Sequence, residues 1–302
     1  PAAASESPAL LDDQPATATA PESTVPLDRV LHEVDRGWTL RFEPAWWYAA
    51  PRGEITLPAS VGPVTFDGGT FEPGANENLS ALDADNPTGG FRGSFHLARD
   101  RWRFTIAATH LSTDGVHTVD APGRLGDAFF TAGDTLDTDF SMTTFEASAA
   151  YTLFHGPYAD EPGDPDRFRY TLELLAGARF ENLDINVAVN PGGGARPPEL
   201  TLGDDASELF GQPIGGARLS MDFFRDFTVE VGVTVGYWTL SSGSTASTWD
   251  ILAAFTWRPV QNVGIQVGYQ YLGLAAERDV DDGTFEFTGS SAGLFAGLAV
   301  QF

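Results

Sequence analysis

The sequence predicts a transmembrane antiparallel β-barrel of about ten strands, with twelve or eight strands as alternatives. Three observations support this fold. Apolar and polar residues alternate with a period of two over ten segments, the connections between the segments alternate between short and long, and aromatic residues gather at the segment ends. The 33 glycines and 22 phenylalanines are also too many for a helix bundle.

Composition excludes several classes of protein. The 302-residue chain has 17 basic side chains, all arginine, against 42 acidic ones, and its formal net charge is −25. A protein that binds nucleic acid by neutralising phosphates needs a basic face, so we expect no nucleic-acid partner. The absence of cysteine excludes disulfides, thiolate metal sites and a cysteine nucleophile. No apolar run approaches the roughly 18 residues of a membrane-spanning helix.

Residues 1–36 differ from the rest of the chain. They are rich in alanine, proline, serine and threonine and have no apolar period, so they cannot bury enough surface to offset their ordering entropy. We therefore predict a disordered periplasmic tail, residues 1–36, and a barrel, residues 37–302. An envelope protein partner that holds the tail is the alternative to plain disorder. Because the chain begins at a proline, we expect a preceding segment such as a secretory signal.

Ten segments support the strand count. Each has one apolar face, and most reach the 9–11 residues that a tilted membrane strand needs. A soluble sandwich would have shorter strands, with lysine and glutamate on their outer faces. In chain order the segments are 38–48, 91–98, 102–109, 144–153, 168–181, 217–223, 227–237, 249–258, 263–271 and 293–302.

The connections fall into two classes. Even-numbered segments are followed by turns at 99–101, 224–226 and 258–262 and by a longer polar stretch at 154–167. Odd-numbered segments are followed by 50–88, 113–138, 188–212, 241–247 and 277–283. Short periplasmic turns and longer external loops are typical of membrane barrels. With ten strands, the first and the last strand should both have their chain ends on the periplasmic side. Residues 53–58 extend the first strand or form a hairpin, and a hairpin would raise the count to twelve.

Aromatic residues mark both ends of the predicted strands. They form one band toward the loops, which includes Trp47 and Trp238, and a second band toward the turns. Such bands are expected where amphipathic rings meet lipid headgroups. The predicted girdle consists of Trp46, Tyr48, Trp102, Tyr237, Trp257 and Tyr271.

The last segment, SSAGLFAGLAVQF, ends the chain on Phe302 after alternating apolar residues. It resembles the C-terminal signature of Gram-negative outer-membrane β-barrel proteins, and the resemblance covers roughly residues 38–302. It implies location in the bacterial outer membrane, contact with outer-membrane lipid and lipopolysaccharide, and recognition by the barrel-assembly machinery, with Phe302 as the assembly signal.

Charged residues on the faces opposite the apolar ones predict a network inside the barrel. Seven arginines and seven acids point inward, so the lumen is formally neutral. Buried ions persist only when paired and hydrogen-bonded, and a ten-stranded barrel is close to the size that side chains fill. We expect a filled or nearly filled lumen, with a narrow small-solute channel as the alternative. The predicted network comprises Arg41, Glu43, Arg92, His96, Arg103, Glu146, Arg169, Glu173, Arg179, Glu181, Arg218, Asp222, Glu230, Asp250 and Arg258.

The acidic excess lies in the tail and the external loops. We expect a solvated surface that serves a structural, adhesive or interaction role, and we expect no cofactor. Divalent cations that bridge the acidic loops to lipopolysaccharide are the alternative. Asp279, Asp281 and Asp282 precede Gly283, but their spacing is not that of a calcium-binding loop.

Two short motifs offer enzymatic alternatives to a role without catalysis. The pair His110 and Ser112 is similar to that of lipid A deacylase barrels, which would make His110 the base for Ser112, oriented by Asp139. Ten strands and this length also resemble the omptin proteases, where Asp83 and Asp85 would match one aspartate pair. No Asp-x-His follows to complete that motif, and we expect no enzyme activity.

Overall fold

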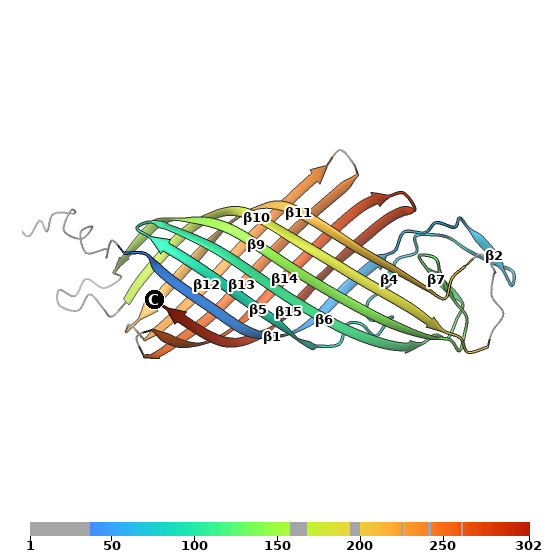
Figure 1. The fold of residues 1–302 in the computed structure, drawn as a ribbon, viewed down its shortest axis with the longest axis horizontal. Helices are drawn as coiled ribbons and strands as arrows, with labels where there is room; N and C mark the ends of the chain where they lie inside the picture. The colour runs from blue at the N-terminus through green and yellow to red at the C-terminus, as the bar shows by residue number, and fades with distance from the viewer. Residues whose placement is uncertain (1–36, 158–167, 194–199, 225, 241–242, 261) are drawn as a thin grey trace, which may run out of the picture. The chain divides into compact units, whose positions relative to one another are not determined.

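The computed structural model describes residues 37–157, 168–193, 200–224, 226–240, 243–260 and 262–302. Within the unit Gly37–Phe302, these residues form an antiparallel β-barrel (Figure 1). The tail predicted for residues 1–36 lies outside the described residues. No helix in the described part of the chain is long and apolar enough to cross a membrane.

Ten long strands form the barrel wall, which confirms the predicted count. The pairing of β1 with β15 closes the ring, where Leu40 and Phe302 exchange backbone hydrogen bonds of 3.1 and 2.8 Å. In ring order the strands are β1 (Thr39–Thr56), β5 (Thr88–Arg99), β6 (Trp102–Thr118), β9 (Thr135–Pro157), β10 (Phe168–Asn190), β11 (Gly203–Phe223), β12 (Phe227–Leu240), β13 (Ser244–Val260), β14 (Val263–Val280) and β15 (Gly283–Gln301).

Five short strands lie in the connections between the wall strands. Two hairpins form, one from β2 (Val64–Phe66) with β3 (Gly69–Phe71) and one from β7 (Gly123–Leu125) with β8 (Ala128–Phe130). The two-residue β4 (Glu77–Asn78) pairs with the end of β1. Because β1 continues to Thr56, most of the stretch 53–58 extends the first strand and does not form a hairpin of its own, and the alternatives of twelve and eight wall strands are wrong.

The wall strands are longer than the sequence alternation predicts. Strands β9 and β10 have 23 residues each, and β6 pairs with β9 as far as Thr118 and Thr135. Much of the predicted connections 50–88, 113–138, 188–212, 241–247 and 277–283 is therefore strand. The prediction was wrong there because it required an apolar outward face, and the outward faces of these strand ends are polar.

The polarity of the two faces inverts along the strands. On β10 the outward residues change from apolar, ending at Phe180, to polar, beginning at Asn182, while buried inward residues change from Arg179 and Glu181 to Leu183. On three neighbouring strands the change follows one register row, because His110, Thr143 and Asn182 are register partners on β6, β9 and β10. We call the part beyond this row the outer half, the remainder the membrane half, and the outward apolar surface of the membrane half the apolar belt.

Apolar side chains fill the outer half. Phe140 on β9 stacks on Phe287 of β15 with ring centroids 5.6 Å apart, although these strands are not neighbours. Leu57 and Leu82 from the β1–β5 connection are buried in the same core. Trp47 also belongs to this core and is 0% exposed, so its prediction as a membrane-facing aromatic is wrong. Its position in β1 points it inward, opposite to Trp46 and Tyr48.

Candidate functional site

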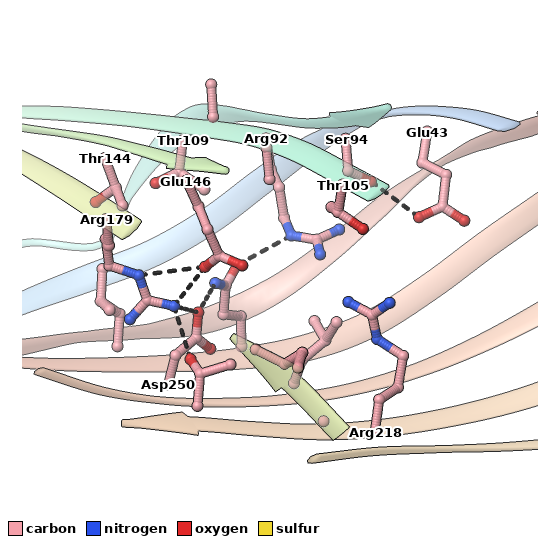
Figure 2. A pocket seen from close by; sticks show the side chains of 18 of the residues that line it. Glu43, Arg92, Ser94, Thr105, Thr109, Thr144, Glu146, Arg179, Arg218 and Asp250 are labelled. Carbon is pink, nitrogen blue, oxygen red and sulfur yellow. Dashed lines mark hydrogen bonds and ion pairs between the residues drawn. The ribbon is translucent and has the colours of Figure 1, made fainter. Parts of the chain in front are cut away.

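The lumen of the membrane half contains an ionic cluster centred on Arg179. This side chain is 1% exposed and lies 2.7 Å from Glu146 and 3.3 Å from Asp250. Figure 2 shows Arg179 with Glu146 and Asp250, and the guanidinium also donates to the hydroxyls of Thr234 and Thr248. The cluster links side chains of β9, β10, β12 and β13. It therefore connects strands that are not all hydrogen-bonded neighbours, because β11 lies between β10 and β12.

A second cluster lies nearer the turns and crosses the lumen from β6 to β12. Arg103 is 3.2 Å from Glu173 and 3.7 Å from Glu230. Arg218 contacts the same two carboxylates at 3.7 and 3.5 Å. Two arginines therefore share two buried acids, an arrangement in which no charge is left without a partner.

A third group surrounds Glu43 on β1. The carboxylate pairs with Arg41 and accepts hydrogen bonds from Ser94 at 3.0 Å and Gln266 at 3.3 Å. His96 Nε2 lies 3.2 Å from the same carboxylate, and its Nδ1 lies 3.0 Å from the Thr105 hydroxyl. Glu43 Oε1 therefore faces Arg41 and Gln266, and Glu43 Oε2 faces Ser94 and His96.

The remaining predicted network residues also lie on inward positions, with differing partners. Arg92 donates to Gln270 at 3.0 Å and lies over the Phe295 ring, 4.6 Å from its centroid. Glu181 accepts from Gln212 at 3.0 Å. Arg258 donates to Thr228, which donates to Asp222. Arg169 is 69% exposed at the turn end, 3.8 Å from Asp222.

A polar cavity of about 70 Å³ lies between the Arg179 and Glu43 groups. Arg92, Thr109, Thr144 and Arg218 line it (Figure 2). Side chains from opposite walls bound this cavity, so it is a small polar pocket inside a packed lumen.

Asp127 holds the loops at the outer end together. It accepts backbone hydrogen bonds from Ser60 at 3.0 Å and Val61 at 3.2 Å, and Arg124 lies 3.0 Å away. Burial alone would raise the pKa of this carboxyl. The hydrogen bonds from Ser60, Val61 and Arg124 lower the pKa by more than burial raises it, so the pKa lies below the usual range. Sequence reasoning placed Asp127 only in a solvated acidic loop, and nothing in the local sequence indicates its distant partner.

The three candidate catalytic residues face outward and do not form a triad. His110 Nδ1 lies 2.9 Å from the Thr143 hydroxyl. Ser112 is the register partner of Ser141, and Asp139 is that of Asp114. Among the described residues, no hydrogen bond joins His110 to Ser112 or Asp139. The described residues also contain no group of three or more side chains suited to hold a metal ion. The expectation of no cofactor and its alternative, divalent cations at the acidic loops, both stay predictions.

The predicted girdle residues point away from the lumen. Trp46, Tyr48, Trp102, Tyr237 and Trp257 are all exposed, and Tyr271 packs on Trp249 with ring centroids 4.5 Å apart. Phe302 is exposed at the turn end of β15, beside β1. This position does not test the predicted role of Phe302 as an assembly signal, which stays a prediction.

A row of polar side chains crosses four strands just beyond the apolar belt. Asp114, Asp139, Asn186 and Asp205 are successive register partners on β6, β9, β10 and β11. Asp114 and Asp139 place two like charges directly opposite each other. Like charges in that arrangement destabilise a sheet.

We expect Asp139→Asn to stabilise the barrel. Removal of one charge should raise the free energy of unfolding by roughly 0.2–1 kcal/mol at low salt, and the gain should shrink as salt screens the pair. Asp137→Asn is the matched control, because Asp137 lies on the same face of β9 opposite Val116 and Ala188. Urea unfolding in detergent micelles measures both. Equal effects of the two substitutions at low salt would contradict the prediction.

No protein-family model and no curated protein matches the chain. Among solved structures, the outer membrane protease OmpT from Escherichia coli is 11% identical, with 87% of this chain and 97% of that chain covered and a TM-score of 0.46. Neisserial surface protein A is 15% identical, with 88% and 97% covered and a TM-score of 0.30. Ail, the attachment invasion locus protein of Yersinia pestis, is 12% identical, with 87% and 99% covered and a TM-score of 0.29. At these identities no role is carried to this chain.

The class of protein follows from the barrel itself. A closed antiparallel ring satisfies its backbone groups within hydrocarbon, and the apolar belt around a polar lumen is the arrangement that lipid requires. The chain is an integral membrane protein of the antiparallel β-barrel class.

Proposed function

We propose that this barrel is a non-conducting, non-enzymatic scaffold that presents an acidic surface for interaction outside the membrane. The observation that carries this proposal is contact between side chains of non-neighbouring strands at two levels. Arg103 on β6 meets Glu230 on β12 in the membrane half, and Phe140 meets Phe287 in the outer half. A lumen filled in this way leaves its outer end as the part available for function.

The surface of the outer half is strongly acidic. In the described residues of this half, the arginines are Arg52, Arg124 and Arg278. Acidic residues lie on the outer ends of β1, β6, β9, β10, β11, β14 and β15 and in the β1–β5, β6–β9 and β14–β15 connections. Such a surface attracts basic partners and steers their approach. Rigid strands that continue past the membrane hold these charges in place.

Planar-bilayer recording tests the absence of conduction. The full chain, reconstituted at high protein density, is expected to show no steady single-channel steps, because paired ions and stacked rings block the lumen. A large porin in the same bilayer provides the positive control. Regular steps from this protein would instead identify a narrow channel, the alternative that the polar cavity favours.

A further inference from the structure

The ladder between β11 and β12 stops partway along β11. Pairing runs from Phe223 and Phe227 only as far as Ile214 and Gly236. Strand β11 continues outward to Gly203 and pairs there with β10 alone. Figure 1 shows the β12–β13 hairpin diverging from β11 toward the outer end. We call residues Gly203–Pro213 of β11, on the side away from β10, the open edge.

Pro213 explains why the ladder stops. Leu209 C=O accepts a hydrogen bond from Arg278 of β14 at 2.6 Å, so the backbone groups of Leu209 point to the open edge. Backbone groups alternate in direction along a strand, and position 213 therefore points the same way. Proline has no N–H to donate, which ends pairing on that side.

Side chains occupy only part of the open edge. Gly203 C=O accepts from the Thr201 hydroxyl, and Asp205 N–H donates to the Asp204 carboxylate. By the same alternation, Ser207 and Gly211 also direct their backbone groups outward, and both residues are exposed. Among the described residues, no strand pairs with them on this side.

The outer edge of β6 provides a contrast. Its ladder with β5 ends at His110, and the chain's own β1–β5 connection packs against β6 beyond that point. A Cβ at Gly115 of β6 would lie 2.4 Å from the carbonyl oxygen of Leu82. The connection therefore lies close against the inward face of β6 in the region where β5 no longer pairs with it.

We propose that the open edge of β11 binds an extended, basic segment of another protein, which adds to the sheet as a further strand. This proposal rests on the interaction role proposed above and locates it. Backbone groups at Ser207 and Gly211 supply the hydrogen bonds of strand addition. Asp205 on the outward face selects for basic side chains, and the exposed Leu209 on the same face offers an apolar contact, whereas Glu208 is already paired with Arg278 at 2.6 Å.

The test uses a short synthetic peptide in which lysine and valine alternate, with a fluorescent label. Its binding to the full chain in neutral detergent is measured by fluorescence anisotropy. Ser207→Pro removes an outward N–H and should weaken binding about tenfold or more, because one hydrogen bond and its neighbours are lost. Ser207→Thr keeps the N–H and should bind as the wild type does. Thermal unfolding establishes that both variants are folded.

A charge exchange provides a second test if Ser207→Pro fails to fold. Asp205→Lys should weaken binding of the lysine peptide and strengthen binding of a matched peptide with glutamate in place of lysine. Equal binding by wild type, Ser207→Pro and Asp205→Lys would overturn the open edge as the site. Absence of saturable binding would overturn it as well. Edge-dependent dimers of the wild type would show that a second copy, not a basic partner, occupies it.

The proposed function and this inference can fail separately. Channel steps in the bilayer would refute the scaffold role whatever the peptide does. Salt-sensitive binding that ignores both substitutions would retain an acidic interaction surface and reject its location on β11.

Discussion

Replacement of Arg179 by methionine is expected to lower the free energy of unfolding by about 3–5 kcal/mol, the usual result of removing one partner from a buried ionic group. Glu146 and Asp250 would be left without their shared cation in the low-dielectric lumen. Methionine keeps much of the side-chain volume, so the loss reports on charge more than on a cavity. Reversible urea unfolding in micelles or liposomes measures the difference.

Arg169→Met is the matched control for that substitution. Arg169 lies on the same strand and also faces an acid, but its side chain is mostly exposed and 3.8 Å from Asp222. An exposed pair contributes about 0–1 kcal/mol, so this variant should unfold almost as the wild type does. Similar losses at both positions would show that the Arg179 cluster is not a special source of stability.

Leu174→Arg is expected to destabilise the barrel by about 2–4 kcal/mol, the cost of an arginine on the lipid face near the bilayer midplane. Leu174 is exposed on the outward face of β10, well inside the apolar belt that ends at Phe180. The same measurement of unfolding in liposomes applies, and the yield of folded barrel after refolding gives an independent readout.

Asn186→Arg tests where the membrane ends. Asn186 has the same outward orientation on the same strand but lies beyond the inversion row, between Asp139 and Asp205. An arginine there meets water and two carboxylates, so a change of at most about 1 kcal/mol is expected. If Asn186→Arg destabilised as much as Leu174→Arg, the apolar belt would extend further than the polarity of its faces indicates.

Strand alternation predicted the membrane half because lipid imposes the same rule on every strand that crosses it. The sequence reading ended the fifth strand at Glu181, although Leu183, Ile185, Val187 and Val189 keep the inward phase of Arg179. The alternation of inward and outward residues continues without a break along β10, and only the polarity of the two faces changes. A search for continuous phase, without regard to which face is apolar, would have found the outer half.

Other parts of the site depend on the tertiary arrangement and could not be predicted. Inward charges could be counted from parity, but the choice of Glu146 and Asp250 as partners of Arg179 depends on the stagger between strands around the ring. Asp127 accepts a hydrogen bond from Ser60, which lies 67 residues away in the sequence, so only the folded chain brings the two together. The open edge had one local signal, Pro213, which the sequence reading did not use. The prediction for Trp47 was wrong because it grouped this residue with the adjacent aromatic residues Trp46 and Tyr48. The alternation along β1 places Trp47 on the inward face.

The inversion of the two faces also fixes how deep the molecule sits. Displacement of the barrel in the direction of its turn end would carry Asn182, Asp184 and their neighbours into hydrocarbon, and displacement the other way would expose Phe180 and Phe145 to water. Both directions are opposed all along the row of His110, Thr143 and Asn182, so the protein has a preferred immersion level set by its own wall. The acidic outer end is therefore held at a constant height above the lipid and in one orientation.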